Sequence, residues 1–364
     1  MPPTRRQFLQ AAGFAFVGCS PVPAWRAGAQ ARRREVTVNG ARVKTVDVHA
    51  HCAVAEALKL MGVTLGTPGP STRPDLSLAT HLAERVRAMD EQGIDVEALS
   101  INPYWYKAER ELAKQLIAIQ NEKLAEVCKA HPDRFVAFAS VALQHPELAA
   151  EQLEEAVKKH GLRGAGIGGS VEADELSHPK FDVFWAKAEQ LGVLVFMHPQ
   201  GGGAAAQLAS RLKGNGLLDN VIGLPLETTI ALSHLIFEGT LDKFPNLKLC
   251  SAHSGGYLPS YAARSDHGCL TQPARCSPPP YGPIKKKPSE YLKQLYYDTM
   301  VFTSEGLRHL IAEVGASQLM IGTDYPYPWT KTAVDHVLNT PGLSDADRTA
   351  ILGGNAMKLL GIKA

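Results

Sequence analysis

The chain has 364 residues, of which 45% are hydrophobic and 20% charged, and its formal net charge is +2 at pH 7. This composition is typical of a globular protein with enough apolar residues for one large core or two modest ones. The near-neutral charge, without aromatic residues interleaved among basic runs, gives no reason to expect nucleic acid or an anionic membrane surface as a partner.

The N-terminal segment 1–31 has the order of a signal peptide, with a charged stretch, an apolar run and then small residues. The stretch from Arg5 to Leu9, RRQFL, resembles the twin-arginine type, which directs export of an already folded protein. We therefore expect a periplasmic protein whose single domain covers 32–364. A general secretory signal and a lipid anchor at Cys19 are the alternatives. The apolar run is shorter than the roughly 18 to 20 residues that span a bilayer, so we expect no membrane span.

Short apolar runs typical of buried strands recur along the rest of the chain. The candidate strands are 45–51, 96–101, 135–143, 162–167, 193–198, 247–253, 295–299 and 319–324. Helical patterns, with apolar positions three and four residues apart, lie between them at 82–92, 109–129, 147–160, 181–191, 228–241 and 305–314. This alternation of strand and helix predicts a (β/α)8 TIM barrel of the metal-dependent hydrolase type, with an open doubly wound sheet as the competitor.

Three further segments complete the expected barrel. The Gly- and Pro-rich stretches 66–74 and 265–288 are predicted to be long loops at a barrel end, and 345–360 is predicted to be a closing helix. Cys269 and Cys276 lie in the second of these loops, where they could pair in an oxidising compartment.

The first candidate strand ends in the sequence VDVHAH, which contains His49 and His51. Side chains alternate between the two faces of a strand, so these two imidazoles are expected on one face, with Asp47 in step behind them. Two nitrogen donors would then converge at the C-terminal end of the strand. In a TIM barrel this is the end at which catalytic groups gather.

Three other candidate strands also end in a residue that can bind a metal ion. The fifth ends in MHP with His198, the sixth in HSGG with His253, and the eighth in GTDYPYP with Asp324. Together with the histidine pair of the first strand, they offer neutral nitrogens and one anionic oxygen, a set that suits Zn²⁺ or a similar divalent ion. A water at an open position of such an ion has its pKa lowered toward roughly 7.

The motifs VDVHAH, MHP, HSGG and GTDYPYP, in this order, resemble the amidohydrolase superfamily. The resemblance is to the branch of metal-dependent decarboxylases related to 2-amino-3-carboxymuconate 6-semialdehyde decarboxylase, and it covers most of the chain. It implies His253 as the acid/base residue and one zinc ion held by His49, His51, His198 and Asp324. In binuclear relatives a carbamylated lysine on the fourth strand bridges two metals, but here that strand reads LRGAGIGG, so a single metal is implied.

Two arginines match substrate-binding positions of this branch. Arg264 corresponds to an arginine that reaches the neighbouring subunit's substrate carboxylate, which implies a homodimer, and Arg73 fits a second such arginine. Guanidinium suits this role because it pairs with carboxylate in a bidentate manner, although either residue could be a solvated loop arginine. The chain departs from the decarboxylase at Gln200, where that enzyme has Trp, and at Ser254, where it has Gly. We therefore expect a different substrate pocket.

Three functions follow as hypotheses. The leading one is nonoxidative decarboxylation of an unsaturated or aromatic carboxylic acid, in which His253 takes a proton from the metal-bound water. The second is hydrolysis of an amide or lactone at the same site, with Asp324 or His253 relaying the proton. The third is an exported metal-binding protein without catalysis. The metal ligands alone do not separate the first two, but arginines directed at an acid favour the decarboxylase.

Overall fold

A computed structural model describes residues 33–200, 208–213, 216–276, 280 and 282–363. The predicted signal peptide and Cys19 lie outside these residues.

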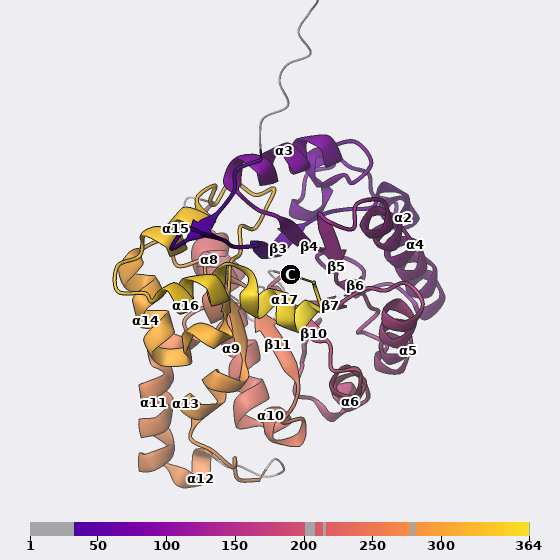
Figure 1. Cartoon of the computed structure of the whole chain (residues 1–364). Helices are drawn as coiled ribbons and strands as arrows, with labels where there is room; N and C mark the ends of the chain where they lie inside the picture. The colour runs from indigo at the N-terminus through magenta and orange to yellow at the C-terminus, as the bar shows by residue number, and fades with distance from the viewer. Residues whose placement is uncertain (1–32, 201–207, 214–215, 277–279, 281, 364) are drawn as a thin grey trace, which may run out of the picture. The chain divides into compact units, whose positions relative to one another are not determined.

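Parallel strands form the centre of the structure, and helices surround them (Figure 1). The strands are β3 (Val46–His51), β4 (Val96–Ser100), β5 (Phe135–Ala137), β6 (Ala139–Ser140), β7 (Gly164–Ile167), β10 (Leu194–Met197), β11 (Lys248–Ser251), β12 (Tyr296–Asp298) and β13 (Leu319–Met320). Nearly all of their residues are buried, as in parallel sheets that are covered on both faces.

The strands belong to two parallel sheets, ordered β3-β4-β5 and β13-β12-β11-β10-β7-β6. β5 and β6 are two parts of one strand interrupted at Phe138, whose backbone N–H still donates to the carbonyl of Leu99 at 2.9 Å. At the other edge, the N–H of Val48 in β3 donates to the carbonyl of Ile321 after β13 at 3.0 Å. The sheets therefore close into the predicted (β/α)8 barrel.

The helices follow the strands in alternation, as the sequence predicts. They are α2 (Ala55–Leu60), α3 (Leu82–Gln92), α4 (Arg110–Ala130), α5 (Pro146–Lys158), α6 (Asp182–Leu191), α8 (Ala209–Leu212), α9 (Leu224–Phe237), α10 (Thr240–Lys243), α11 (Leu258–Thr271), α12 (Pro273–Cys276), α13 (Pro288–Tyr291), α14 (Ser304–Val314), α15 (Ala333–Asn339), α16 (Asp345–Thr349) and α17 (Asn355–Leu360). Two short antiparallel pairs lie outside the barrel: β1 (Thr37–Val38) with β2 (Ala41–Arg42), and β8 (Ser170–Val171) with β9 (Asp174–Glu175).

The last helix covers the N-terminal end of the barrel. Ala356 and Leu360 of α17 belong to the same buried cluster as Val46 and Val96, which are the first residues of β3 and β4. Figure 1 shows α17 crossing the ends of the strands. The site is therefore expected at the opposite, C-terminal end, where the strand ends are not covered by this helix.

The expectation that 265–288 is entirely a loop is wrong. Helix α11 continues to Thr271, and α12 follows it. Pro259 lies in the first turn of α11, where proline is tolerated, and no other proline interrupts the chain before Pro273, so no proline stops the helix earlier. Cys269 and Cys276 form a disulfide that joins α11 to α12, with their Cα atoms 5.0 Å apart.

One helix among the described residues, Asp219–Phe237, is long and apolar enough to cross a membrane by length and composition alone. Its residues Leu232 and Leu235 are fully buried in the main core. This packing accounts for part of its apolar composition, while Val221 and Ile222 near its start are exposed.

Candidate active site

The C-terminal strand ends bring together all five residues that the sequence singles out. His51 Nε2 lies 3.0 Å from His49 Nε2 and 2.9 Å from Asp324 Oδ1. His198 follows β10, and its ring centroid is 4.6 Å from that of His51. His253 Nε2 lies 3.7 Å from Asp324 Oδ2. These side chains therefore share one small buried space.

The donor atoms converge closely enough to hold one ion. One potential ligand atom from each of His49, His198, His253 and Asp324 lies within 4.8 Å of the others. This set contains His253 rather than His51, but the distances of His51 to His49 and Asp324 are shorter still. His253 has the most exposed of the five side chains, at 16%, while the others are 7% or less. Greater exposure suits a group that exchanges protons with a substrate.

The unsatisfied polar atoms at the cluster also fit a metal ion. Both ring nitrogens of His198 are buried without a hydrogen-bond partner among the described residues. Among the same residues, Oδ1 of Asp324 is buried with only the ring nitrogens of His49 and His51 close to it. Buried polar atoms are rarely unpaired, and an ion or water commonly explains those that are. Imidazole nitrogens and a carboxylate oxygen form a suitable donor set for Zn²⁺ or Mn²⁺. A single divalent metal is supported.

Hydrogen bonds from outside the cluster fix both histidines of β3. His49 Nδ1 lies 2.7 Å from Asp298 Oδ2, and His51 Nδ1 lies 3.2 Å from the Ser100 hydroxyl. A carboxylate at Nδ1 favours the tautomer with its proton there, which leaves Nε2 of His49 free to bind a metal. Sequence reasoning missed Asp298. The signal was present, because this carboxylate ends the seventh strand, β12.

Asp298 also holds the turn that carries His253. Its carboxylate accepts the backbone N–H groups of His253 at 2.8 Å and Ser254 at 2.7 Å. His253 and Ser254 have φ of 54° and 58°, and Asp324 has φ of 60°, so all three lie in the left-handed region that disfavours side chains. Such strain is typical of functional sites, where the surrounding structure holds a residue in one direction.

Asp47 does not join the cluster, contrary to the expected alternation along β3. The pairing of β3 with β4 shifts register between Asp47 and Ala50. The Asp47 carboxylate accepts the backbone N–H of His49 at 2.9 Å and the N–H and hydroxyl of Thr323 after β13. A β-bulge of this kind re-aims side chains next to active sites.

Burial and charge set the protonation of the cluster. Burial lowers the pKa of His51 to about 4 and holds the pKa of His198 well below its ordinary value. Burial also opposes a proton on His49, but the carboxylates of Asp324 and Asp298 outweigh it and raise the pKa of His49 to about 10. Burial by itself would raise the pKa of Asp324, yet the imidazoles around it hold that pKa well below the usual value. The cluster therefore contains an ionised carboxylate and neutral imidazoles at His51 and His198, while His49 carries a proton that a bound metal ion would displace.

The two predicted substrate arginines lie in different places. The Arg73 guanidinium stacks 5.1 Å from the centroid of the Tyr327 ring, and that ring is 5.6 Å from the His51 ring, so Arg73 is close to the cluster. Arg264 is exposed on α11, where it lines a surface hollow with Tyr261 and no residue of the cluster. Within one chain, the structure brings only Arg73 to the site.

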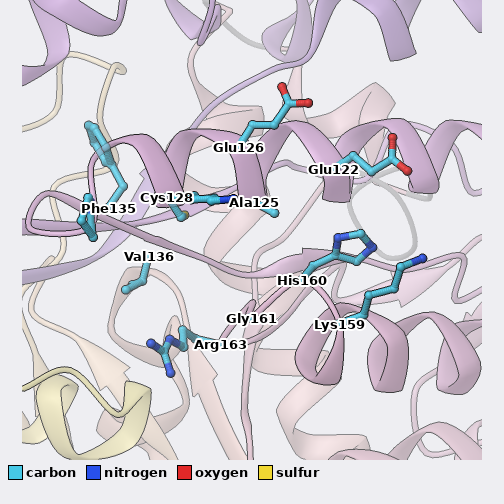
Figure 2. Close-up of a pocket in the computed structure, with 12 residues that line it drawn as sticks. Glu122, Ala125, Glu126, Cys128, Phe135, Val136, Lys159, His160, Gly161 and Arg163 are labelled. Carbon is cyan, nitrogen blue, oxygen red and sulfur yellow. The ribbon is translucent and has the colours of Figure 1, made fainter.

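A separate hollow of about 540 Å³ lies at the opposite end of the barrel, beside the first residues of β5 and the segment before β7 (Figure 2). Its acidic and basic side chains come from α4, from Lys159 and His160 after α5, and from Arg163 before β7. Glu126 is paired with Lys123 at 2.7 Å, and Lys159 with Glu155 at 2.9 Å. Two of its charges are thus paired with neighbours in the sequence, and no residue of the histidine cluster lines this hollow.

Comparison with known proteins places the chain in a family. The family model described as Amidohydrolase matches residues 46–362. The chain is 30% identical over 283 residues to the 2-amino-3-carboxymuconate-6-semialdehyde decarboxylase of Dictyostelium discoideum, covering 76% of each protein. It is 32% identical over 286 residues to the gamma-resorcylate decarboxylase of a Polaromonas species, covering 76% of this chain and 86% of that one.

A solved structure supports the same relationship. A dihydroxybenzoic acid decarboxylase from Polaromonas, with bound manganese and the inhibitor 2-nitroresorcinol, superimposes with a TM-score of 0.75 at 30% identity, over 88% of this chain and 98% of that one. The chain therefore belongs to the amidohydrolase family, in the branch that includes the 2-amino-3-carboxymuconate-6-semialdehyde decarboxylases.

Proposed function

We propose that the protein is a metal-dependent, nonoxidative decarboxylase of an aromatic carboxylic acid. The observation that carries the proposal is the buried cluster of four histidines and Asp324 at the C-terminal end of the barrel. The names of the relatives agree with this chemistry, since they include decarboxylases of gamma-resorcylate and dihydroxybenzoic acid. Within the branch, these relatives favour an aromatic acid over other unsaturated acids.

In this proposal one metal ion is held by His49, His51, His198 and Asp324. When bound, the ion polarises a substrate oxygen and stabilises the negative charge that develops as CO₂ leaves. We propose zinc as this ion, because three imidazoles and one carboxylate suit it. Manganese is bound in the Polaromonas structure, so metal analysis of the purified protein must decide between the two.

His253 is assigned the proton transfer. Decarboxylation breaks the bond between the ring carbon and the carboxylate carbon, and the electron pair of that bond must receive a proton. His253 Nε2 lies 3.7 Å from Asp324 Oδ2 and is the most exposed imidazole of the cluster, so it can face both the ligand sphere and the substrate. A positioned histidine of this kind contributes on the order of 10²- to 10⁴-fold to the rate.

Arg73 is assigned the orientation of the substrate acid. Its guanidinium stacks on Tyr327, whose ring faces His51, and it donates to Asp75 at 3.0 Å. A fixed guanidinium holds a carboxylate or phenolate by charge-assisted hydrogen bonds. Arg264 is too exposed to act within one chain, and its assignment rests on a homodimer in which it reaches the site of the second copy. We expect Arg73→Ala to raise KM more than it lowers kcat.

The decisive experiment measures CO₂ from purified, metal-analysed protein incubated with a panel of phenolic and unsaturated acids that includes 2,6-dihydroxybenzoate. The proposal predicts CO₂ and the corresponding phenol. If the protein is instead an amide or lactone hydrolase, a panel of amides and lactones should be hydrolysed, and oxygen from labelled water should enter the products. Bound metal with no turnover on either panel would favour a metal-binding protein without catalysis.

We also propose that the protein is exported by the twin-arginine route. The disulfide between Cys269 and Cys276 supports this, because disulfides persist in oxidising compartments. Changing both Arg5 and Arg6 to Lys should retain the protein in the cytoplasm of a bacterial host, as measured by cell fractionation. A wild-type protein found in the cytoplasm would refute export, and one that partitions into detergent with a lipid on Cys19 would favour the lipid anchor.

A further inference from the structure

Gln200 has an unexplained hydrogen-bond donor beside the cluster. It comes two residues after His198 at the C-terminal end of β10, so it belongs to the same mouth of the barrel. Its side-chain Nε2 is buried without a hydrogen-bond partner among the described residues. A buried donor left unsatisfied lowers stability, so it calls for an acceptor that binds there.

Neighbouring strand ends hold this side chain in a wall. A methyl group placed on Gly168, after β7, would lie 3.3 Å from Gln200 Cγ and 3.1 Å from the Tyr106 ring. The Tyr106 hydroxyl accepts the backbone N–H of Gly168 at 2.9 Å, so its oxygen already has a partner. The glycine lets both side chains approach closely, and within the described part of the chain the Gln200 amide nitrogen has no hydrogen-bond partner.

The donor is neutral, and the chemistry of an amide nitrogen favours an oxygen acceptor. An amide NH₂ binds carboxylate, hydroxyl or phenolate oxygen, and it gains nothing from a ring carbon. A site that is built to hydrogen-bond a substrate rejects an analogue that lacks the bonding group, because the buried donor is then left unpaired. Such a group contributes to selectivity rather than to bond breaking.

We propose that Gln200 is a specificity-determining residue whose Nε2 donates a hydrogen bond to an oxygen substituent of the aromatic substrate. The ligand class is thus an aromatic acid that carries a hydroxyl group, rather than an unsubstituted one. This inference rests on the proposed function, since it assumes that an aromatic acid occupies the space next to the histidine cluster.

The test compares the affinities of three ligands that have no carboxylate and cannot be decarboxylated: 2-nitroresorcinol, 2-nitrophenol and nitrobenzene. Each is titrated into metal-loaded protein by calorimetry. In the wild type, affinity should rise as hydroxyl groups are added. In Gln200→Leu, the gain in affinity that comes with one of the hydroxyl groups should be about 3- to 10-fold smaller than in the wild type, which corresponds to one hydrogen bond. Gln200→Glu should weaken the affinity for the same hydroxylated ligand by a larger factor, because a negatively charged acceptor replaces the donor.

Gln318→Leu is the matched control. Gln318 is also half-buried, but it lies just before β13 at the other end of the barrel, where its amide donates to the Leu295 carbonyl at 2.8 Å. This variant should keep every step of the affinity series, and all variants should bind the metal as tightly as the wild type. The role of Gln200 would be refuted if Gln200→Leu kept the full gain in affinity for each hydroxyl group, or if it bound all three ligands more weakly by the same factor. The proposed function would not be affected by either result. A wild type that binds none of the three would refute the proposed substrate class, and the role of Gln200 with it.

Discussion

Replacing Asp298 by Asn should weaken metal binding although Asp298 is not a ligand. Its Oδ2 accepts from His49 Nδ1 at 2.7 Å and from the His253 N–H at 2.8 Å, and its Oδ1 accepts from the Ser254 N–H at 2.7 Å. Asparagine has one acceptor oxygen and can serve only one side of this arrangement. If its oxygen stays with Ser254, its NH₂ faces His49 Nδ1. That imidazole must then place its own proton on Nε2, where it blocks a metal.

Loss of a partner of this kind typically weakens metal affinity by about 10- to 100-fold, which is about 1.4 to 2.8 kcal/mol. The assay is competition with a chelator of known affinity, together with circular dichroism to verify that the variant is folded. Asp335→Asn is the control, because Asp335 forms a half-exposed ion pair with Arg34 and should leave metal affinity unchanged. A folded Asp298→Asn protein with the metal affinity of the wild type would show that Asp298 does not set the tautomer of His49.

His253→Ala should keep its metal and lose turnover by a factor on the order of 10² or more, and metal loss in this variant would make His253 a ligand instead. Ser254→Ala should lower the free energy of unfolding by about 1 kcal/mol, because the hydroxyl that donates to the Asp298 carbonyl at 3.0 Å is lost while φ stays at 58°. Ser254→Gly should cost less, since glycine relieves that backbone conformation; the reverse order in urea denaturation would contradict the strain. Arg85→Met should cost about 3–5 kcal/mol in the same assay, because it leaves Glu97 buried without its partner at 2.8 Å, and a loss below 1 kcal/mol would mean that Glu97 is readily neutralised.

The sequence by itself determined the barrel and the identity of the five clustered residues. Alternating apolar runs and helical patterns determine a parallel α/β fold because every parallel strand must be buried on both faces and followed by a crossover helix, and eight such units favour the barrel over an open doubly wound sheet. His198 and Asp324 could be singled out because equivalent strand ends meet at one mouth, whatever the detailed packing. The helix through 265–271 was missed because its polar sequence has no apolar periodicity, and it is held by its continuation from Leu258 and by a disulfide.

Only the tertiary structure decided how the cluster is held and what faces it. A register shift in β3 separates Asp47 from His49, and no sequence period reports a bulge. Asp298 orients His49 although the two residues are far apart in the sequence. The packing of three strand ends buries the Gln200 amide nitrogen without a partner among the described residues. These relations depend on side chains from distant segments meeting in space, which local patterns of residues do not encode.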